Sequence, residues 1–193
     1  TDAGHEKLLA TAAQLATYNP EFFSCTYGAG GSTRDRTLNT VLQLDGEIKV
    51  PTAPHLSCVG DSKEDLRELL HLYKDAGIKR IVALRGDLPS GMGMANGELR
   101  YANELVEFIR HETGDHFYIE VAAYPEMHPQ ARDFEVDLQN FARKVQAGSD
   151  SAITQYFFNA DCYFYFVDRA RKLGIDIPIV PGIMPITNYS KLA

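Results

Sequence analysis

The sequence has no tryptophan and only three cysteines among 193 residues. Cys25, Cys58 and Cys162 are odd in number, far apart and never in a Cys-x-x-Cys pair, so a disulfide or zinc framework is not expected. This cysteine usage is typical of reduced thiols in a cytoplasmic protein. The chain also lacks an apolar run of roughly 18 residues and a signal-like N-terminus, which predicts a soluble protein with no membrane span.

Basic residues are fewer than acidic ones, 19 Lys and Arg against 26 Asp and Glu, which gives a formal net charge of −7. An acidic balance spread along the whole chain argues against a nucleic acid or an anionic membrane as the partner. Charged residues make up 23% of the sequence and hydrophobic residues 45%, so a disordered chain is excluded. The length predicts one domain that spans residues 1–193.

Apolar periodicity and turn residues predict an alternation of helices and strands with no linker between them. The predicted strands are 21–27, 50–57, 78–84, 117–123, 151–157 and 177–181. The predicted helices are 8–16, 33–44, one from Ser62 to a left-handed C-cap at Gly77, 101–109, 133–147 and 161–173, with another beginning at Asn188. This order predicts right-handed βαβ units and a parallel sheet, an α/β fold.

Polar or special residues lie at the carboxyl end of each predicted strand, where chemistry collects in parallel α/β folds. They are Thr26, His55, Arg85 with Asp87, Tyr124, Gln155 and Gly182. A doubly wound sheet would concentrate such residues at one switch point, whereas a barrel distributes them around a common mouth. Because they recur once in each βα unit, we expect a (β/α) TIM barrel, of which six units are visible.

Each of these residues also has a structural interpretation. His55 lies among apolar residues and is either a satisfied core histidine or a ligand contact. Arg85-Gly86-Asp87 is either a surface turn or a binding turn, in which Gly86 permits a close approach of a ligand to the backbone. Gln155 is a neutral amide inside an apolar run, which favours a ligand contact because buried amides need partners. The glycine-rich segment 28–32 matches neither a Walker loop nor a dinucleotide fingerprint, although an anion at the following helix start stays open.

The predicted helix 133–147 carries two stripes of side chains. Its core stripe consists of Phe134, Leu138, Phe141 and Val145. Asp137, Asn140 and Lys144 form a second, polar stripe about 100° around the axis, with Arg143 near its opposite edge. A solvated face is the default interpretation of such a stripe. A ligand with hydroxyl and phosphate groups lying along the helix would use the same residues, and Tyr124 and His128 precede them.

Together these motifs resemble the methylenetetrahydrofolate reductase family, the flavoproteins of folate one-carbon metabolism, in its bacterial form. The matching segments are Cys25-Thr26-Tyr27-Gly28-Ala29, Ala53-Pro54-His55-Leu56, Ala83-Leu84-Arg85-Gly86-Asp87, Ala122-Ala123-Tyr124-Pro125-Glu126 with His128-Pro129, Ala152-Ile153-Thr154-Gln155, and Pro181-Gly182-Ile183-Met184-Pro185. The resemblance implies a (β/α)8 TIM barrel that holds FAD at the carboxyl ends of its strands.

Carried over position by position, the resemblance implies a set of FAD contacts. They are Tyr27, Ala29, His55, Arg85, Gly86, Asp87, Tyr101, Ala102, Tyr124, His128, Ala131, Asp137, Asn140, Arg143 and Lys144. Thr26 and Gln155 match positions that touch the nicotinamide or the folate, and Asp87 also faces the substrate. The resemblance therefore implies that Asp87 and Gln155 carry the catalytic role and that no metal takes part.

The implied activity is the reduction of 5,10-methylenetetrahydrofolate to 5-methyltetrahydrofolate with NADH or NADPH, through FAD, in methionine biosynthesis. Asp87 is expected to stabilise cationic character in the folate, and Gln155 to orient the pterin or the nicotinamide. The family also implies a homo-oligomer in the cytoplasm.

The chain departs from the family in what it lacks. The family's first strand carries a Phe-Glu-Phe-Phe-Pro motif whose Glu is the proposed general acid, and this motif is absent. We therefore expect a barrel truncated at both ends, with six central units, and the alternative is a non-catalytic barrel fragment that retains weak flavin binding. A flavin-free aldolase is disfavoured because Lys49 and Lys79 lie at the starts of their strands, where a Schiff-base lysine is not expected.

Overall fold

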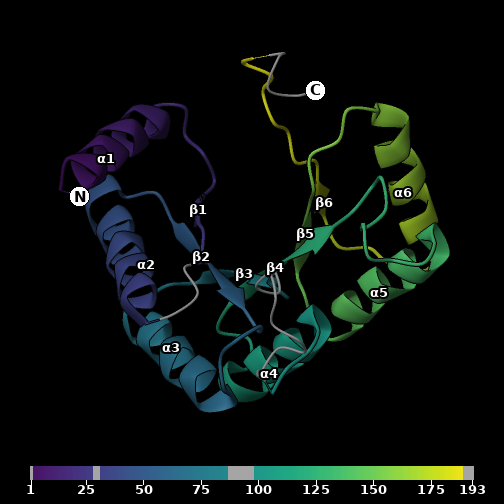
Figure 1. Ribbon diagram of the computed structural model, residues 1–193, viewed down its shortest axis with the longest axis horizontal. Helices are drawn as coiled ribbons and strands as arrows, with labels where there is room; N and C mark the ends of the chain where they lie inside the picture. Colours follow the sequence, from purple (N-terminus) through teal and green to yellow (C-terminus); the bar gives the residue numbers. More distant parts are fainter. Residues whose placement is uncertain (1, 28–30, 87–97, 189–193) are drawn as a thin grey trace. The chain divides into compact units, whose positions relative to one another are not determined.

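A computed structural model describes residues 2–27, 31–86 and 98–188, without side-chain detail for residues 2–3 and 31–36. Helices and strands alternate along this part of the chain (Figure 1). In chain order the elements are α1 (Asp2–Ala16), β1 (Phe23–Cys25), α2 (Gly31–Gln43), η1 (Leu44–Ile48), β2 (Thr52–Ser57), α3 (Lys63–Asp75), β3 (Arg80–Leu84), α4 (Ala102–Thr113), β4 (Tyr118–Ala123), α5 (Phe134–Gln146), β5 (Ser151–Thr154), α6 (Ala160–Lys172) and β6 (Ile179–Val180).

The strands pair in parallel, and their order in the sheet is the order in the chain. The register aligns Phe23 with Thr52 and His55 with Val82 in the first three strands. It aligns Glu120 with Ser151, and Ala152 with Ile179, in the last three. The α/β fold with consecutive parallel βα units, as in a TIM barrel, is therefore confirmed.

The chain divides into two compact units, of which the first comprises Thr1–Ile119. Its core lies between the sheet and the helices that follow β2 and β3. Helix α3 buries Leu66, Leu69, Leu70 and Tyr73, the apolar positions predicted from the helical period. They lie in a core with residues of the strands and of α4 that are completely buried, such as Leu56, Ile81 and Ile109.

The second unit comprises Glu120–Ala193 and has a core of its own. Helix α5 buries Leu138 and Phe141, and α6 buries Phe166 and Ala170. The rings of Phe141 and Phe166 lie with their centroids 5.3 Å apart, which joins the two helices. Val121 of β4 and Ala152 of β5 contribute fully buried side chains from the sheet.

The helix boundaries follow the local signals in the sequence. The Ser62 hydroxyl caps α3 by accepting the Asp65 N–H, and the Asp65 carboxylate in turn accepts the Ser62 backbone N–H. Asp133 caps α5 through a bond from Val136 N at 2.8 Å. The helix-to-strand joints at Gly77, Gly148 and Gly174 have φ of 85°, 111° and 78°, so the predicted left-handed C-cap at Gly77 is confirmed.

The strands are shorter than predicted at several ends. The predicted strands 21–27 and 177–181 reduce to β1 and β6, with three and two residues. The predicted strand 151–157 ends at Thr154, because the Gly182 N–H, which would continue the ladder with β6, is not bonded to the Thr154 carbonyl. Gly182 instead donates its N–H to the Thr154 hydroxyl at 2.9 Å. Residues 28–30 and the predicted helix start beyond residue 188 lie outside the described residues.

The predicted helix 33–44 was also wrong at its end. Helix α2 ends at Gln43 and continues as one π-helical turn, η1, that closes at Lys49 with φ of 58°. The Asp45 carboxylate accepts a bond from Thr52 N at 3.2 Å, which ties this turn to the start of β2. The Asp45-Gly46 pair breaks the α-helix, and the bond to Thr52 explains why the chain does not end there in an ordinary turn.

Arg80, the first residue of β3, joins three segments of the first unit. Its guanidinium lies 4.4 Å from the ring centroid of Phe22 and 4.3 Å from that of Tyr118, one ring from each neighbouring segment. The same group donates to the exposed carboxylate of Glu21 at 2.8 Å. Because the Arg80 side chain is only 19% exposed, the two cation–π contacts are partly desolvated and are stronger than on an open surface.

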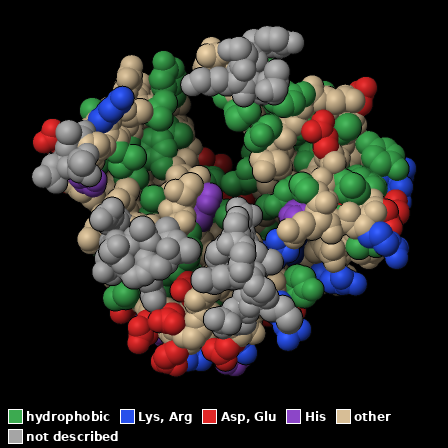
Figure 2. Space-filling view, viewed as in Figure 1, with side chains coloured by type: hydrophobic (Ala, Val, Ile, Leu, Met, Phe, Trp, Pro, Cys, Tyr) green, Lys and Arg blue, Asp and Glu red, His purple; other side chains and the backbone are tan. Residues whose placement is uncertain are grey.

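Figure 2 shows charged side chains of both signs over α3 and α4 of the first unit, as expected for the solvated faces of amphipathic helices. In the part of the chain that the structure describes, no helix combines the length and the apolar character needed to span a membrane.

We predict that Arg80→Ala lowers the free energy of unfolding by about 1–3 kcal/mol, because both cation–π contacts and their packing are lost. Arg80→Lys should recover only part of this loss, because lysine keeps the charge but its ammonium cannot stack flat between two rings. Urea unfolding followed by circular dichroism measures both values. Arg132→Ala is the matched control: Arg132 is 82% exposed and, among the described residues, forms an ion pair with its neighbour Asp133 alone, so its loss should stay within about 0.5 kcal/mol. An equal effect of Arg80→Ala and Arg132→Ala would contradict the role of the two rings.

Candidate functional site

The loop that follows β4 is fixed by hydrogen bonds at almost every step. Met127 adopts a left-handed conformation, with φ of 71°, and donates its N–H to Tyr124 O at 3.1 Å. His128 donates its N–H to the Asp137 carboxylate of α5 at 2.9 Å and accepts the Ala131 N–H at its carbonyl at 2.9 Å. The structure therefore brings Tyr124, His128, Ala131 and Asp137 together, all of them predicted site residues.

The His128 ring is oriented by two further contacts. Its Nδ1 accepts the Gln130 N–H at 3.0 Å, so the neutral ring carries its proton on Nε2. Its centroid lies 4.6 Å from that of Tyr124 in an edge-to-face arrangement. Both side chains are half-buried. The ring is thus held as an Nε2–H donor beside an aromatic face.

Lys144 projects from α5 toward the end of β4. Its Nζ donates to Ala122 O and lies 5.9 Å from the Tyr124 ring centroid and 5.7 Å from that of Phe141. Burial lowers the pKa of Lys144 from 10.5 to about 8, and the nearby charge of Asp137 acts in the opposite direction. Among the described residues no carboxylate forms an ion pair with Lys144 at hydrogen-bond distance, and burial of such a charge is typical of a functional position.

The rest of the polar stripe on α5 is solvated. Asn140 and Arg143 are exposed, and Arg143 Nη1 donates to Asn140 Oδ1 at 2.7 Å. The two interpretations of the stripe therefore apply to different residues. Asp137 and Lys144 are engaged at the end of β4, whereas Asn140 and Arg143 form the solvated face that the helical pattern alone predicted.

In the first unit, the end of β3 forms a tight turn. Gly86 has φ of 87°, and Arg85 is half-buried with its Nε 3.4 Å from Gly86 O. A Cβ atom at Gly86 would lie 2.0 Å from the Ser57 hydroxyl, so this position requires glycine for two independent reasons. Asp87, the predicted catalytic carboxylate, lies outside the described residues, as does Ala29.

His55 lies within β2 and is half-buried. Burial lowers the pKa of its imidazole, so the ring is neutral at pH 7. Among the described residues its side chain has no hydrogen-bond partner, so this part of the chain does not support the interpretation as a satisfied core histidine.

The remaining predicted residues of the first unit differ in exposure. The half-buried Tyr27 donates its hydroxyl to the Asp61 carboxylate, and Thr26 beside it is exposed. Tyr101 is 57% exposed at the N-cap of α4, and Ala102 begins that helix. Sequence reasoning missed Asp61, whose only signal is a carboxylate in the loop before the Ser62 cap.

Gln155 is placed differently from its prediction as a buried amide within a strand. It follows the end of β5 and its side chain is exposed. Its backbone N–H donates to Ala123 O at 2.8 Å, and its Oε1 accepts the Tyr156 N–H at 3.0 Å. Because Oε1 already accepts this bond, the side-chain NH₂ group remains as a donor. Gln155 therefore lies at the carboxyl end of the strand as predicted, but the prediction that its side chain is buried was wrong.

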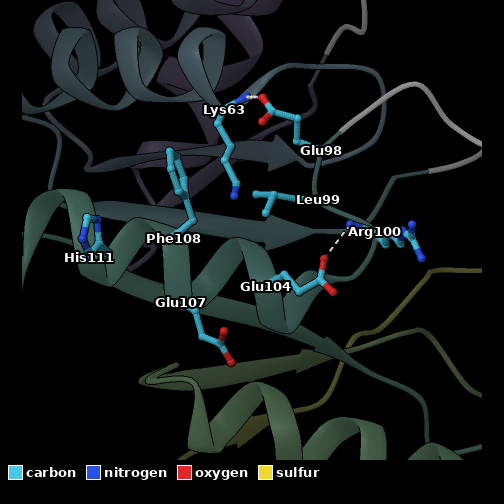
Figure 3. A pocket seen from close by; sticks show the side chains of 8 residues that line it. All are labelled: Lys63, Glu98, Leu99, Arg100, Glu104, Glu107, Phe108 and His111. Carbon is cyan, nitrogen blue, oxygen red and sulfur yellow. Dashed lines mark hydrogen bonds between the residues drawn. The ribbon is translucent and has the colours of Figure 1, made fainter.

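A pocket of about 460 Å³ lies between α3 and the N-terminal part of α4 (Figure 3). Its walls include three carboxylates, Glu98, Glu104 and Glu107, against two full cations. Glu98 and Glu104 are used to accept the backbone N–H groups of Lys63 and Arg100, at 2.8 and 2.7 Å. None of the predicted site residues lines this pocket, and its acidic walls disfavour a phosphate-bearing ligand.

The described residues contain no group of three or more His, Cys, Asp or Glu side chains that could hold a metal ion. The donor set at the end of β4 consists instead of the Lys144 ammonium and the His128 imidazole N–H. Such donors suit phosphate and hydroxyl oxygens, and an aromatic face lies beside them.

Comparison with known proteins adds the family. The family model described as methylenetetrahydrofolate reductase matches residues 1–193. A 5,10-methylenetetrahydrofolate reductase of Pectobacterium carotovorum subsp. carotovorum is 44% identical over 187 residues, which cover 97% of this chain and 61% of that protein. The enzyme of the same name from Escherichia coli (strain K12) is 43% identical over 178 residues, 92% of this chain and 58% of that protein. The chain thus spans about three-fifths of the length of these relatives.

Solved structures add only the fold. A phosphonopyruvate hydrolase in complex with oxalate and Mg²⁺ superposes with a TM-score of 0.67 over 95% of this chain and 66% of that chain, at 11% sequence identity. At this identity the likeness shows a shared architecture and no shared chemistry.

We predict that Asp137→Asn moves the pKa of Lys144 below its value of about 8, because the carboxylate charge raises that pKa against the effect of burial. NMR titration of lysines labelled with ¹³C at Cε measures the shift, with the exposed Lys74 as the internal reference. Glu135→Gln is the matched control, since Glu135 lies on the same helix and pairs with Arg169 instead. A Lys144 pKa that is the same in wild type and Asp137→Asn would contradict the coupling.

Proposed function

The chain belongs to the methylenetetrahydrofolate reductase family, and from this premise we propose that it supplies the FAD-binding barrel of a reductase. The reaction is the conversion of 5,10-methylenetetrahydrofolate to 5-methyltetrahydrofolate with NADH or NADPH. The proposal includes the family's role in methionine biosynthesis, a homo-oligomeric assembly and a cytoplasmic location. Bound FAD would carry hydride between the nicotinamide and the folate.

The observation that carries this proposal is the half-buried Lys144 at the end of β4. Its ammonium has one hydrogen bond among the described residues, to Ala122 O, and two N–H donors remain for an anion. Beside it, His128 presents an Nε2–H in its neutral form. A cation with a lowered pKa next to a fixed N–H donor suits the diphosphate of FAD, which would repay the cost of burying the charge.

The other residues of the second unit fit the remaining parts of the cofactor. Asp137 keeps one carboxylate oxygen bonded to the His128 backbone and can accept from a ribityl or ribose hydroxyl with the other. Asn140 and Arg143 offer an amide and a guanidinium on the solvated side. Tyr124 offers a half-buried ring. The donor set therefore fits a ligand that combines phosphates, hydroxyls and a planar ring system.

In the first unit, the neutral His55 and the half-buried Arg85 are available as polar contacts to a flavin. Tyr27, tied to Asp61, would offer its ring and its hydroxyl oxygen. Thr26 would contact the nicotinamide, and Tyr101 and Ala102 would complete the cofactor contacts. These assignments rest on the family and on the exposure of each side chain.

Two residues would act on the substrates. Gln155 would donate its NH₂ group to a carbonyl of the pterin or the nicotinamide and so orient its ring, since its Oε1 is already engaged. Asp87 would place a negative charge beside the folate and stabilise the cationic iminium form that accepts hydride. The same charge would disfavour further negative charge on the reduced cofactor.

Anaerobic stopped-flow absorbance at the flavin band tests the proposed activity in its two halves. NADH or NADPH should bleach the band of the FAD-loaded protein, and 5,10-methylenetetrahydrofolate should restore it with formation of 5-methyltetrahydrofolate. Reduction by neither nucleotide, or no reoxidation by the folate, would contradict the proposal.

We predict that Asp87→Asn retains FAD and slows the folate half-reaction by about tenfold or more, while the nucleotide half-reaction slows less. The same stopped-flow experiment gives both rates. Asp115→Asn, which removes an exposed carboxylate in the turn before β4, should leave both unchanged. Equal slowing of the two half-reactions in Asp87→Asn would refute the role given to this carboxylate.

We also predict that the affinity for FAD falls as the pH rises through about 8. Burial lowers the pKa of Lys144 to about 8 in the free protein. Below that pH the ammonium is charged and attracts the diphosphate, and above it the free protein must take up a proton to bind. Fluorescence titration between pH 6 and 10 should show a decline of up to tenfold per pH unit above about 8 in wild type.

Two variants separate this effect from general loss of structure at high pH. Lys144→Arg keeps its charge and should bind FAD with a flat profile across this range. Lys144→Ala should bind more weakly at pH 7 and show little dependence on pH. A wild-type profile that is flat to pH 10, or one that Lys144→Ala shares, would place the phosphates away from Lys144.

A further inference from the structure

Ser57 is the last residue of β2 and its side chain is buried, with 8% exposure. Its hydroxyl donates to Arg85 O at 2.9 Å and accepts the Val59 N–H at 3.3 Å. A single buried hydroxyl thus links the end of β2 to the residue that follows β3. Neither the helical and strand periodicities nor the strand-end motifs of the sequence singled it out.

The Arg85 carbonyl is an unusual point of convergence. Besides the Ser57 hydroxyl, it accepts the Val59 N–H at 3.0 Å and faces the Cys58 thiol at 3.4 Å. Donors from three successive residues, the last of β2 and the two that follow it, therefore meet one oxygen. This arrangement fixes the peptide plane between Arg85 and Gly86, from which the next part of the turn departs.

The same hydroxyl fills the space against Gly86. A Cβ built on Gly86 would lie 2.0 Å from Ser57 Oγ and 3.2 Å from its Cβ, and the φ of 87° is a conformation that other residues rarely adopt. The Ser57 side chain is thus complementary in shape to the bare Gly86 backbone and is bonded to the Arg85 carbonyl before it. The half-buried Arg85 side chain turns back toward Gly86 O at 3.4 Å and shares this conformation.

We propose that Ser57 is a positioning residue for the cofactor: its hydroxyl holds the Arg85-Gly86 turn in the conformation in which Arg85 and the Gly86 backbone meet FAD. The inference rests on the proposed function, because it assumes that the turn contacts FAD. Ser57 itself acts through the Arg85 carbonyl. Loss of the hydroxyl removes one of the bonds that hold the peptide plane, and ordering the turn and Arg85 then costs free energy when FAD binds.

The test compares FAD dissociation constants by flavin fluorescence at pH 7 for wild type, Ser57→Ala, Ser57→Thr and Ser57→Val. Ser57→Ala should weaken FAD binding about fivefold or more and shift the flavin absorption band. Ser57→Thr keeps the hydroxyl and should bind within about twofold of wild type. Ser57→Val has the volume of threonine without the hydroxyl and should lose affinity as alanine does, which keeps the test decisive if Ser57→Ala does not fold. Ser24→Ala, at an exposed serine of β1, is the control and should match wild type.

A double-variant cycle with Arg85→Ala separates positioning from general stability. If Ser57 acts through Arg85, then Ser57→Ala should weaken FAD binding far less in the Arg85→Ala background than in wild type. Additive losses, or equal affinities of the Thr and Val variants, would overturn the inference while leaving FAD binding by the wild-type protein intact. Failure of wild type to bind FAD would overturn the proposed function and this inference together.

Discussion

Parallel, in-register pairing of the strands is the constraint on which the candidate site depends. Because neighbouring strands run in the same direction, the residues that follow them emerge at the same edge. The ladders extend one step past the strands, through Val59 N to Arg85 O and Gln155 N to Ala123 O. Backbone hydrogen bonds therefore position the first residues of each loop before any side chain contributes.

Within each of the two units, the loop that follows a strand is then held by further contacts of its own. After β4, the left-handed Met127 and the bond from His128 N to Asp137 fold the loop onto α5. After β3, the Ser57 hydroxyl and the bare Gly86 backbone do the same for the turn that contains Arg85. In both loops the atoms that fix the backbone are next to the side chains assigned to FAD. Such preorganisation lowers the entropic cost of binding a large, flexible cofactor.

Much of the architecture was predictable because its signals are local. The Ser62–Asp65 capping box, the Asp133 cap and the Gly77 C-cap are formed by residues close together in the sequence. The end of β5 was not predictable from its own residues, because it depends on where the Gly182 N–H beyond β6 is bonded. Hydrogen bonds between residues far apart in the sequence, such as that from Tyr27 to Asp61, were not predicted for the same reason. They depend on the register between elements, and apolar periodicity within one element does not contain that information.

The α5 stripe shows what sequence could and could not decide about the site. Its spacing gathered Asp137, Asn140 and Lys144 on one face without distinguishing a solvated face from a binding face. The structure divides the stripe, since Lys144 bonds to Ala122 O beside the Tyr124 ring while Asn140 and Arg143 stay exposed. The angle around the helix axis decides this division, because Asn140 and Arg143 are rotated away from Asp137 and Lys144, and the side that faces β4 depends on how α5 packs.

The central claim is that the residues after the strands hold FAD, and a crystal structure of the protein with FAD tests it most directly. The account predicts that the diphosphate contacts Lys144 and the Nε2 of His128, and that the flavin contacts Arg85 and Gly86. FAD bound elsewhere, such as in the acidic pocket between α3 and α4, or bound without contact to Lys144 and Arg85, would contradict it.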